Sequence, residues 1–129
     1  MRNPWIFKAP ALAWGFLIIY LSLAPVQDLD PGWELNISDK LVHAALYFIW
    51  VMLLYFGTSR AYQKPVSKCS MLSYWVAAIV VGAGLELLQG LMSFGRSADI
   101  IDGLANAGGA LIAIFINPIL HKFLAQFFK

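Results

Sequence analysis

The sequence predicts an all-α membrane protein with four transmembrane helices in one domain, residues 1–129. Hydrophobic residues make up 60% of the chain and charged residues only 12%. The mean hydropathy of +0.71 is far above that of an ordinary soluble domain. The apolar residues form four stretches, each near the roughly 17–25 residues that a spanning helix needs, the first two only with flanking residues. These stretches are 10–24, 41–56, 71–92 and 100–120.

The first stretch shares features with a signal peptide. Arg2 and Lys8 precede the apolar run, and the small residues at 22–24 are similar to a cleavage site. Pro25 follows that site directly, and the run is longer than a usual signal core. We therefore interpret the stretch as the first transmembrane helix.

The other three stretches have distinct boundaries. Asp39 stands near the start of the second, and Asp99 near the start of the fourth, where a carboxylate can cap free N–H groups. The segment 57–70 is expected to be the only sizeable connection on its side of the membrane. Small residues are expected to let the third and fourth helices approach closely. They are Gly82, Gly84, Gly103, Ala105, Gly108, Gly109 and Ala110.

The charged residues sort by segment. The N-terminus, the 57–70 connection and the C-terminus contain seven basic residues and no acid: Arg2, Lys8, Arg60, Lys64, Lys68, Lys122 and Lys129. The other two connections, with the adjoining helix ends, contain all seven acids. Because basic residues accumulate on the cytoplasmic side, both termini are expected to be cytoplasmic. This separation also argues against a nucleic-acid partner, despite the net charge of +2.

In this topology every polar group at membrane depth is expected at the extracytoplasmic end. His43, Glu86 and Asn106 would lie roughly 5–10 Å below that boundary. Three sets of polar residues each repeat at helical spacing and so form one stripe per helix. The sets are Asp39, His43 and Tyr47; Glu86 and Gln89; and Asp99, Asp102 and Asn106. Since an ionisable group in a spanning helix costs about 2.5–3.5 kcal/mol, we expect these stripes to form a functional pocket.

The sequence leaves two alternative roles open for several of these residues. Asp39 and Asp99 are either helix caps or site residues, and Arg96 either binds an anion or pairs with an aspartate. Glu86 needs partners from other helices, for which Arg96 and His43 are candidates. His43 is expected to act as acid or base, with Asp39 orienting it. The candidate catalytic residues are His43, Glu86 and Asp102, and the candidate ligand-binding residues are Asp39, Tyr47, Gln89, Arg96, Ser97, Asp99 and Asn106.

No cofactor is expected, although Asp, Glu and His side chains together suit a divalent metal. The chain contains no H-E-x-x-H or other dense ligand motif, and an arginine among so few ligands favours ion pairs. Cys69 is the only cysteine, which excludes an intramolecular disulfide and a cysteine metal cluster.

An internal repeat is also suggested. The segments 39–44 and 102–107 share the pattern D-x-L-x-[HN]-A, and both open a helix that runs inward. Ser22 and Glu86 lie at similar distances before them, each between two leucines. A duplicated helical hairpin and a chance match remain alternatives.

Three motifs in order resemble the VanZ-like family of small bacterial membrane proteins. They are Asp39-Lys40-x-x-His43-x-x-x-Tyr47, Glu86-x-x-Gln89, and Gly95-Arg96-Ser97-x-Asp99-x-x-Asp102-x-x-x-Asn106-x-x-Gly109. The resemblance covers most of the chain from Ser22 onward. It implies a multi-pass protein of the bacterial cytoplasmic membrane, and the family's namesake is associated with resistance to the glycopeptide teicoplanin. The chain departs from the family pattern at Ala44 and Ala113, where an aromatic residue and a glycine are common.

Four functions follow as alternatives. The first is an enzyme acting on a membrane lipid or a lipid-linked envelope precursor at the outer leaflet, in which Arg96 would hold a phosphate or carboxylate. The second is a module that binds such a lipid or a glycopeptide-type amphiphile without chemistry. A transporter is disfavoured, because the inner halves of the helices carry no charge. The fourth is a purely structural role, in which the polar cluster joins helices at about 1 kcal/mol per contact.

Overall fold

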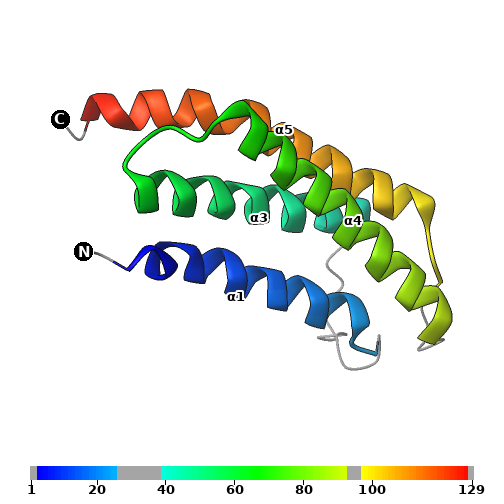
Figure 1. The fold of residues 1–129 in the computed structure, drawn as a ribbon. Coiled ribbons are helices and arrows are strands. Elements are labelled where there is room, and N and C mark those ends of the chain that lie inside the picture. The colour runs from blue at the N-terminus through cyan, green and yellow to red at the C-terminus, as the bar shows by residue number, and fades with distance from the viewer. Residues whose placement is uncertain (1–2, 26–38, 93–96, 128–129) are drawn as a thin grey trace.

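The predicted all-α class is confirmed in a computed structural model that describes residues 3–25, 39–92 and 97–127. Within these ranges the chain forms four helices and no strand (Figure 1). Each helix is long and apolar enough to cross a membrane. The helices are α1 (Pro4–Leu23), α3 (Asp39–Tyr62), α4 (Lys68–Met92) and α5 (Ile100–Phe127).

The helices extend beyond the apolar stretches that predict them. α1 begins at Pro4 because the Asn3 side chain accepts a hydrogen bond from the Trp5 N–H, at 3.1 Å, and proline suits a first helical position. α3 continues to Tyr62, so the predicted 57–70 connection shortens to residues 63–67. Hydropathy marks where a helix becomes polar, whereas backbone capping decides where it ends.

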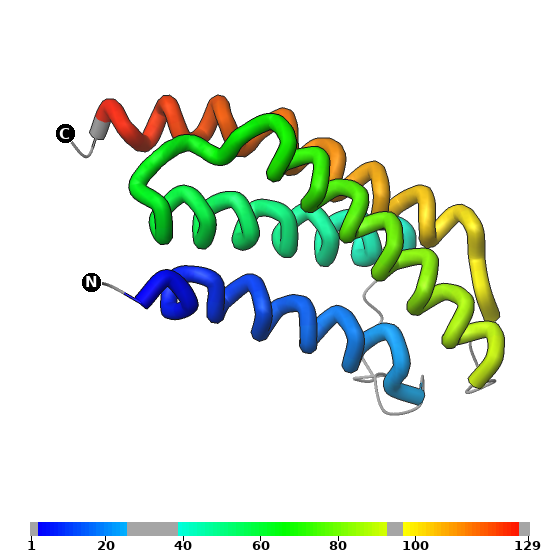
Figure 2. Tube along the Cα trace, in the orientation of Figure 1, coloured from blue at the N-terminus to red at the C-terminus, as the bar shows by residue number. Residues whose placement is uncertain are grey.

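The four helices run alternately up and down. Both ends of the chain and the α3–α4 connection lie at one end of the bundle, and the end of α4 and the start of α5 lie at the other (Figure 2). α3 lies between α1 and α5 and packs most extensively on these two, while α4 packs mainly on α5 (Figure 1). The start of α3, the end of α4 and the start of α5 therefore lie at the same end of the bundle.

The core is small and the outer surface is apolar. Ile18, Tyr47, Val51, Ala78 and Leu85 are buried with Ala110 and Ala113, which gives one core shared by all four helices. Large apolar side chains remain exposed along the outer faces of every helix, among them Phe16, Leu91, Ile100 and Phe115. Such a surface suits contact with lipid chains.

Glycines set the closest helix approaches, but not where the sequence analysis expected all of them. A Cβ on Gly109 would overlap the backbone of Ala44, so Gly109 brings α5 against α3 rather than against α4. Gly57 similarly brings α3 against the Phe7 carbonyl of α1. Gly82 does face α5, because a Cβ placed on it would lie 3.1 Å from Asn106 Nδ2. Gly84, Gly103 and Gly108 have no neighbour within 4 Å of that position.

Tryptophan side chains join neighbouring helices inside the bundle. The Trp14 indole N–H of α1 donates to the Leu46 carbonyl of α3 at 2.9 Å, and the Trp75 indole of α4 donates to the Ala107 carbonyl of α5 at 3.0 Å. The Trp50 indole donates back to the Ala11 carbonyl at 3.0 Å. These three indoles therefore bond between helices, rather than serving only as anchors at the membrane surface.

The expectation that all membrane-level polar groups lie at one end is wrong. Asn117 is fully buried in the other half of α5, and its side-chain amide has no hydrogen-bond partner within the described ranges. The Thr58 and Tyr74 hydroxyls lie 2.6 Å apart between α3 and α4. Ser59 Oγ lies 3.4 Å from His121 Nδ1 between α3 and α5. Apolar windows in the sequence concealed these groups, because single polar residues hardly change the mean of a window.

Candidate functional site

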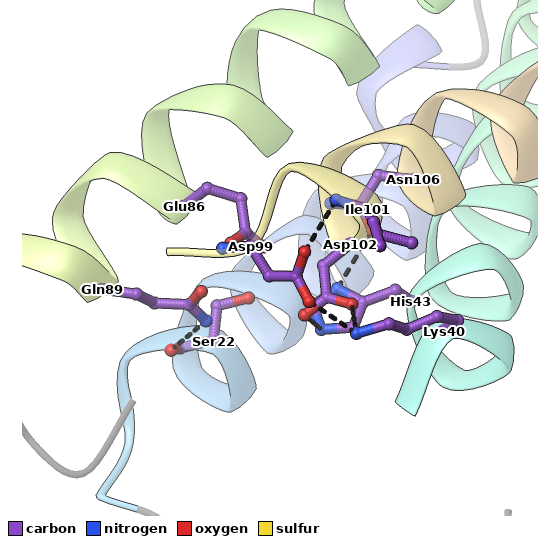
Figure 3. Close-up of polar contacts among 9 residues, drawn as sticks. All are labelled: Ser22, Lys40, His43, Glu86, Gln89, Asp99, Ile101, Asp102 and Asn106. Atoms are coloured by element: carbon purple, nitrogen blue, oxygen red, sulfur yellow. Dashed lines mark hydrogen bonds and ion pairs between the residues drawn. The ribbon is translucent and has the colours of Figure 1, made fainter. Parts of the chain in front are cut away.

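A polar cluster lies where α3 and α5 begin, beside the final turns of α4 (Figure 3). Polar side chains from the start of α3, the end of α4 and the start of α5 contact one another there, as the three predicted stripes require. The antiparallel arrangement produces this meeting, because the three helix ends share one level. We define the cluster by the side chains of Lys40, His43, Glu86, Gln89, Asp99, Asp102 and Asn106.

His43 stands between two side chains of α5. Its Nδ1 atom lies 3.1 Å from Asn106 Oδ1, and its Nε2 atom lies 3.6 Å from Asp102 Oδ2. If Nδ1 carries the only ring proton, it donates a hydrogen bond to Asn106 Oδ1, and the lone pair of Nε2 faces Asp102. If Nε2 is protonated as well, the charged ring forms an ion pair with Asp102. The carboxylate that faces His43 is thus Asp102, whereas Asp39, which we expected to orient it, is exposed at the start of α3.

Lys40 is the cation of the cluster and was not among the predicted site residues. Its Nζ atom lies 2.7 Å from Asp99 Oδ2 and 2.7 Å from Asp102 Oδ1. From the sequence, Lys40 was named only as part of the motif that begins at Asp39. Its position three residues before His43, on the same helix face, was the signal that could have identified it.

Asp99 has both of the roles that the sequence analysis left as alternatives. Its Oδ1 atom accepts a hydrogen bond from the Ile101 N–H at 2.8 Å, which caps the first turn of α5. Its Oδ2 atom pairs with Lys40. The Lys40 ammonium, with the Ile101 N–H as a second contributor, holds the pKa of the Asp99 carboxyl below its ordinary value.

Glu86 and Gln89 are buried on α4, at 7% and 5% exposure. Glu86 Oε2 accepts a hydrogen bond from the Asp99 N–H at 3.0 Å, so this carboxylate holds the start of α5. Gln89 Nε2 donates to the Ser22 carbonyl of α1 at 2.8 Å. Ser22 was not among the predicted site residues. Its contribution is a backbone carbonyl, which every residue type has, so the sequence does not indicate it.

Tyr47 is buried beside the cluster, with 1% of its surface exposed. Its hydroxyl group has no hydrogen-bond partner within the described part of the chain. A Cβ on Gly82 would lie 3.5 Å from this hydroxyl and 3.1 Å from Asn106 Nδ2, so both polar groups pack against Gly82 of α4. A buried hydroxyl without a partner is available to a ligand or to water.

Two further predicted site residues are Ser97 and Arg96. Ser97 is exposed before the start of α5. Arg96 lies outside the described residues, so its pairing with Glu86, Asp99 or Asp102 stays a prediction.

The cluster contains a set of possible metal ligands. One ligand atom each of His43, Glu86 and Asp102 lies within 4.8 Å of the other two. Imidazole and carboxylate groups together suit a divalent cation. Lys40, at 2.7 Å from Asp102, places a positive charge beside the same group and would oppose a second cation. The residues present thus fit an ion pair more readily than a metal.

A protein of Schizosaccharomyces pombe, described as uncharacterized, is similar to this chain. The two are 26% identical over 107 residues, which cover 81% of this chain and 62% of the yeast protein. The chain thus spans less than two thirds of that relative's length. No family model matches the chain. No solved structure matches it either.

Proposed function

We propose that the chain is an integral membrane protein with both termini on the cytoplasmic side. The four helices have the length and composition to span, and the two chain ends lie at one end of the bundle (Figure 1). Of the described residues, Arg60, Lys64 and Lys68 belong to that end, whereas Glu86, Asp99 and Asp102 belong to the other. The positive-inside rule then supports a cytoplasmic position for the termini. We further propose the bacterial cytoplasmic membrane as its location, on the VanZ-like resemblance alone, since the relative found is from a yeast.

The proposed function is recognition of the polar part of an envelope amphiphile at the extracytoplasmic ends of α3, α4 and α5. The ligand would be a membrane lipid, a lipid-linked envelope precursor or a glycopeptide-type molecule. The observation that carries this proposal is the convergence of His43, Glu86 and Asp102 from three helices, with one ligand atom of each within 4.8 Å of the others. The VanZ-like motifs contribute the ligand class, because the family's namesake is associated with glycopeptide resistance.

Each residue has a proposed role in that site. His43 would transfer a proton, and Asp102 would orient its ring and stabilise the charged form. Glu86 would be a second proton carrier, and the Tyr47 hydroxyl would donate a hydrogen bond to the ligand. The described cluster contains three carboxylates and one ammonium group, which favours ligand amines and hydroxyl groups. Any phosphate or carboxylate of the ligand would depend on Arg96.

The test separates catalysis from binding. Purified protein in lipid nanodiscs is incubated with lipid-linked envelope precursors and with teicoplanin, and both retained ligand and released product are measured by mass spectrometry. Product that accumulates beyond one equivalent and disappears in His43→Gln supports an enzyme, whereas stoichiometric retention supports a binding module. Lys68→Gln, an exposed change at the other end of the bundle, is the matched control. Neither product nor retention of any of these ligands would overturn the proposal.

A structural role is the second candidate, and one observation favours it: several polar contacts of the cluster join two helices. Lys40 of α3 holds two aspartates at the start of α5, and Gln89 of α4 holds α1. If the cluster only joins helices, replacing Lys40 and Asp102 together by Met and Leu should restore a cellular function that each single change abolishes.

We also propose that the two hairpins, α1–α3 and α4–α5, derive from a duplication. In each hairpin a tryptophan of the first helix donates its indole N–H to a carbonyl 32 residues further along the chain. The repeat positions His43 and Asn106 bond to each other across the two halves. The paired exchange His43→Asn and Asn106→His should then preserve the thermal stability that each single change lowers. A paired variant less stable than both single variants would contradict this symmetry.

A further inference from the structure

A second polar site lies at the end of the bundle that contains the termini. A pocket of about 300 Å³ opens there between the last turns of α3 and the final part of α5. This volume is at the lower end of the range of about 300–1,000 Å³ for small-molecule sites. The residues that matter for its chemistry are Ser59, Arg60, Lys64 and His121, with Phe56 and Leu124 on its apolar side.

The end of α3 builds the basic side of this pocket. Gln63 adopts a left-handed backbone conformation, with φ of 55°. The Lys64 N–H then donates back to the Ser59 carbonyl at 3.3 Å, the six-to-one bond of a Schellman motif. This reversal returns the chain past the last turn of α3, so that Arg60 and Lys64 both line the pocket.

His121 of α5 is held in place from two sides. Its Nδ1 atom lies 3.4 Å from the hydroxyl of Ser59, a residue that is only 6% exposed. Its ring makes an edge contact with Tyr55, with centroids 5.9 Å apart. If the Ser59 hydroxyl donates to Nδ1, the proton of the neutral ring resides on Nε2, which is then a donor.

The pocket contains two cations, Arg60 and Lys64, that have no acidic partner among the described residues. The four acids of the described ranges, Asp39, Glu86, Asp99 and Asp102, lie on helix ends at the far side of the bundle. Lys8, by comparison, lies over the rings of Trp5 and Tyr62, at 5.6 and 5.3 Å from their centroids. Arg60 and Lys64 make no ion pair within the described chain, and the pocket between them is open to an anion.

We propose that this pocket binds a phosphate group, presented by a lipid head group or free in solution. Arg60 offers a planar fork of donors to the phosphate oxygens, and Lys64 adds a second charge. Ser59 and His121 provide further hydrogen-bonding groups. The pocket lies at the end of a helix long enough to span a membrane, where lipid phosphates are found, and basic pockets between helices are known to hold anionic head groups. Phe56 and Leu124 would contact the glycerol or the first acyl carbons of a lipid.

The test compares two double variants with the same change in charge. Arg60→Gln with Lys64→Gln removes the basic side of the pocket, while Lys68→Gln with Lys122→Gln removes exposed charges that do not line it. The full chain is purified in neutral detergent, and native mass spectrometry measures retention of phosphatidic acid and of phosphatidylcholine. A parallel arm titrates inorganic phosphate and follows the ³¹P line width.

The proposal predicts that the wild type retains phosphatidic acid over phosphatidylcholine, or broadens the phosphate line, and that the pocket variant loses roughly tenfold or more in affinity. The control variant should change by less than about twofold. A signal in the lipid arm alone identifies a head group, and a signal in the phosphate arm identifies a free anion. Equal losses in both variants, or no retention in either arm, would overturn the proposal. The single change Lys64→Glu, at an exposed position, provides a second test should the double variant unfold.

Discussion

At the scale of single residues, Lys40 sets the charge of the polar cluster. Its ammonium group pairs with both Asp99 and Asp102 at the start of α5 and offsets one of their two negative charges. The change Lys40→Met should therefore lower the melting temperature of the purified protein in detergent, more than the exposed change Lys68→Met does. Adding Asp102→Asn to the Lys40 variant should recover part of the loss. Equal melting temperatures for the two lysine variants would show that the ion pairs do not stabilise the bundle.

The Asp99 pair makes a pH-dependent contribution at this scale. Because the pKa of Asp99 is lowered in the fold, the pair stabilises the protein fully above the ordinary carboxyl pKa and less as the pH falls toward the lowered value. Asp99→Asn should consequently be less stable than the wild type at pH 7, and the difference should shrink below about pH 4. Thermal unfolding of both proteins between pH 3 and pH 7 measures it, and a constant difference would contradict the assignment.

Residue type and helical spacing placed His43, Glu86, Asp102 and Asn106 at one level, and the structure brings their side chains together. The same reasoning did not reveal which carboxylate faces His43, because Asp39 lies one turn away on the same helix, whereas Asp102 reaches it from α5. That choice depends on the rotation of α5 against α3. The sequence gives no direct measure of that rotation.

At the scale of helices, the approach of α5 to α3 depends on Gly109. Gly109→Ala should cost about 1–3 kcal/mol, because the added methyl group overlaps the Ala44 backbone. Gly108→Ala, one residue earlier and with open space around it, is the matched control and should be neutral or stabilising by up to about 1 kcal/mol. Unfolding of both variants in a denaturing detergent measures the difference. Similar stabilities would place the helix contact elsewhere.

The number and order of the helices followed from hydropathy, since a spanning helix needs a minimum apolar length. Their ends and partners did not follow. α3 continues through Thr58, Ser59 and Arg60 because a polar last turn is compatible with a helix, and Gln63 ends it through its backbone conformation. Small residues occur on both faces of α5, so their presence alone did not identify α3 as the helix that Gly109 meets.

At the scale of the whole molecule, the proposed topology has a direct test in Cys69. This cysteine is exposed in the first turn of α4, at the end of the bundle with the two termini. A membrane-impermeant maleimide should label it in permeabilised cells but not in intact cells. In a Cys69→Ser background, Ser97→Cys should be labelled in intact cells, because Ser97 is exposed at the opposite end. The reverse pattern would invert the topology.

The central claim for the molecule is that the polar cluster binds a ligand and does not only stabilise the packing of the helices. The most direct measurement is the affinity of purified wild type and His43→Gln for lipid-linked envelope precursors and for teicoplanin, with the melting temperature recorded for both proteins. We predict that the variant binds at least about tenfold more weakly at a temperature where both proteins are folded, since the substitution replaces the imidazole of the site with an amide that does not transfer protons. Unchanged affinity of the folded variant for all of these ligands would contradict the claim.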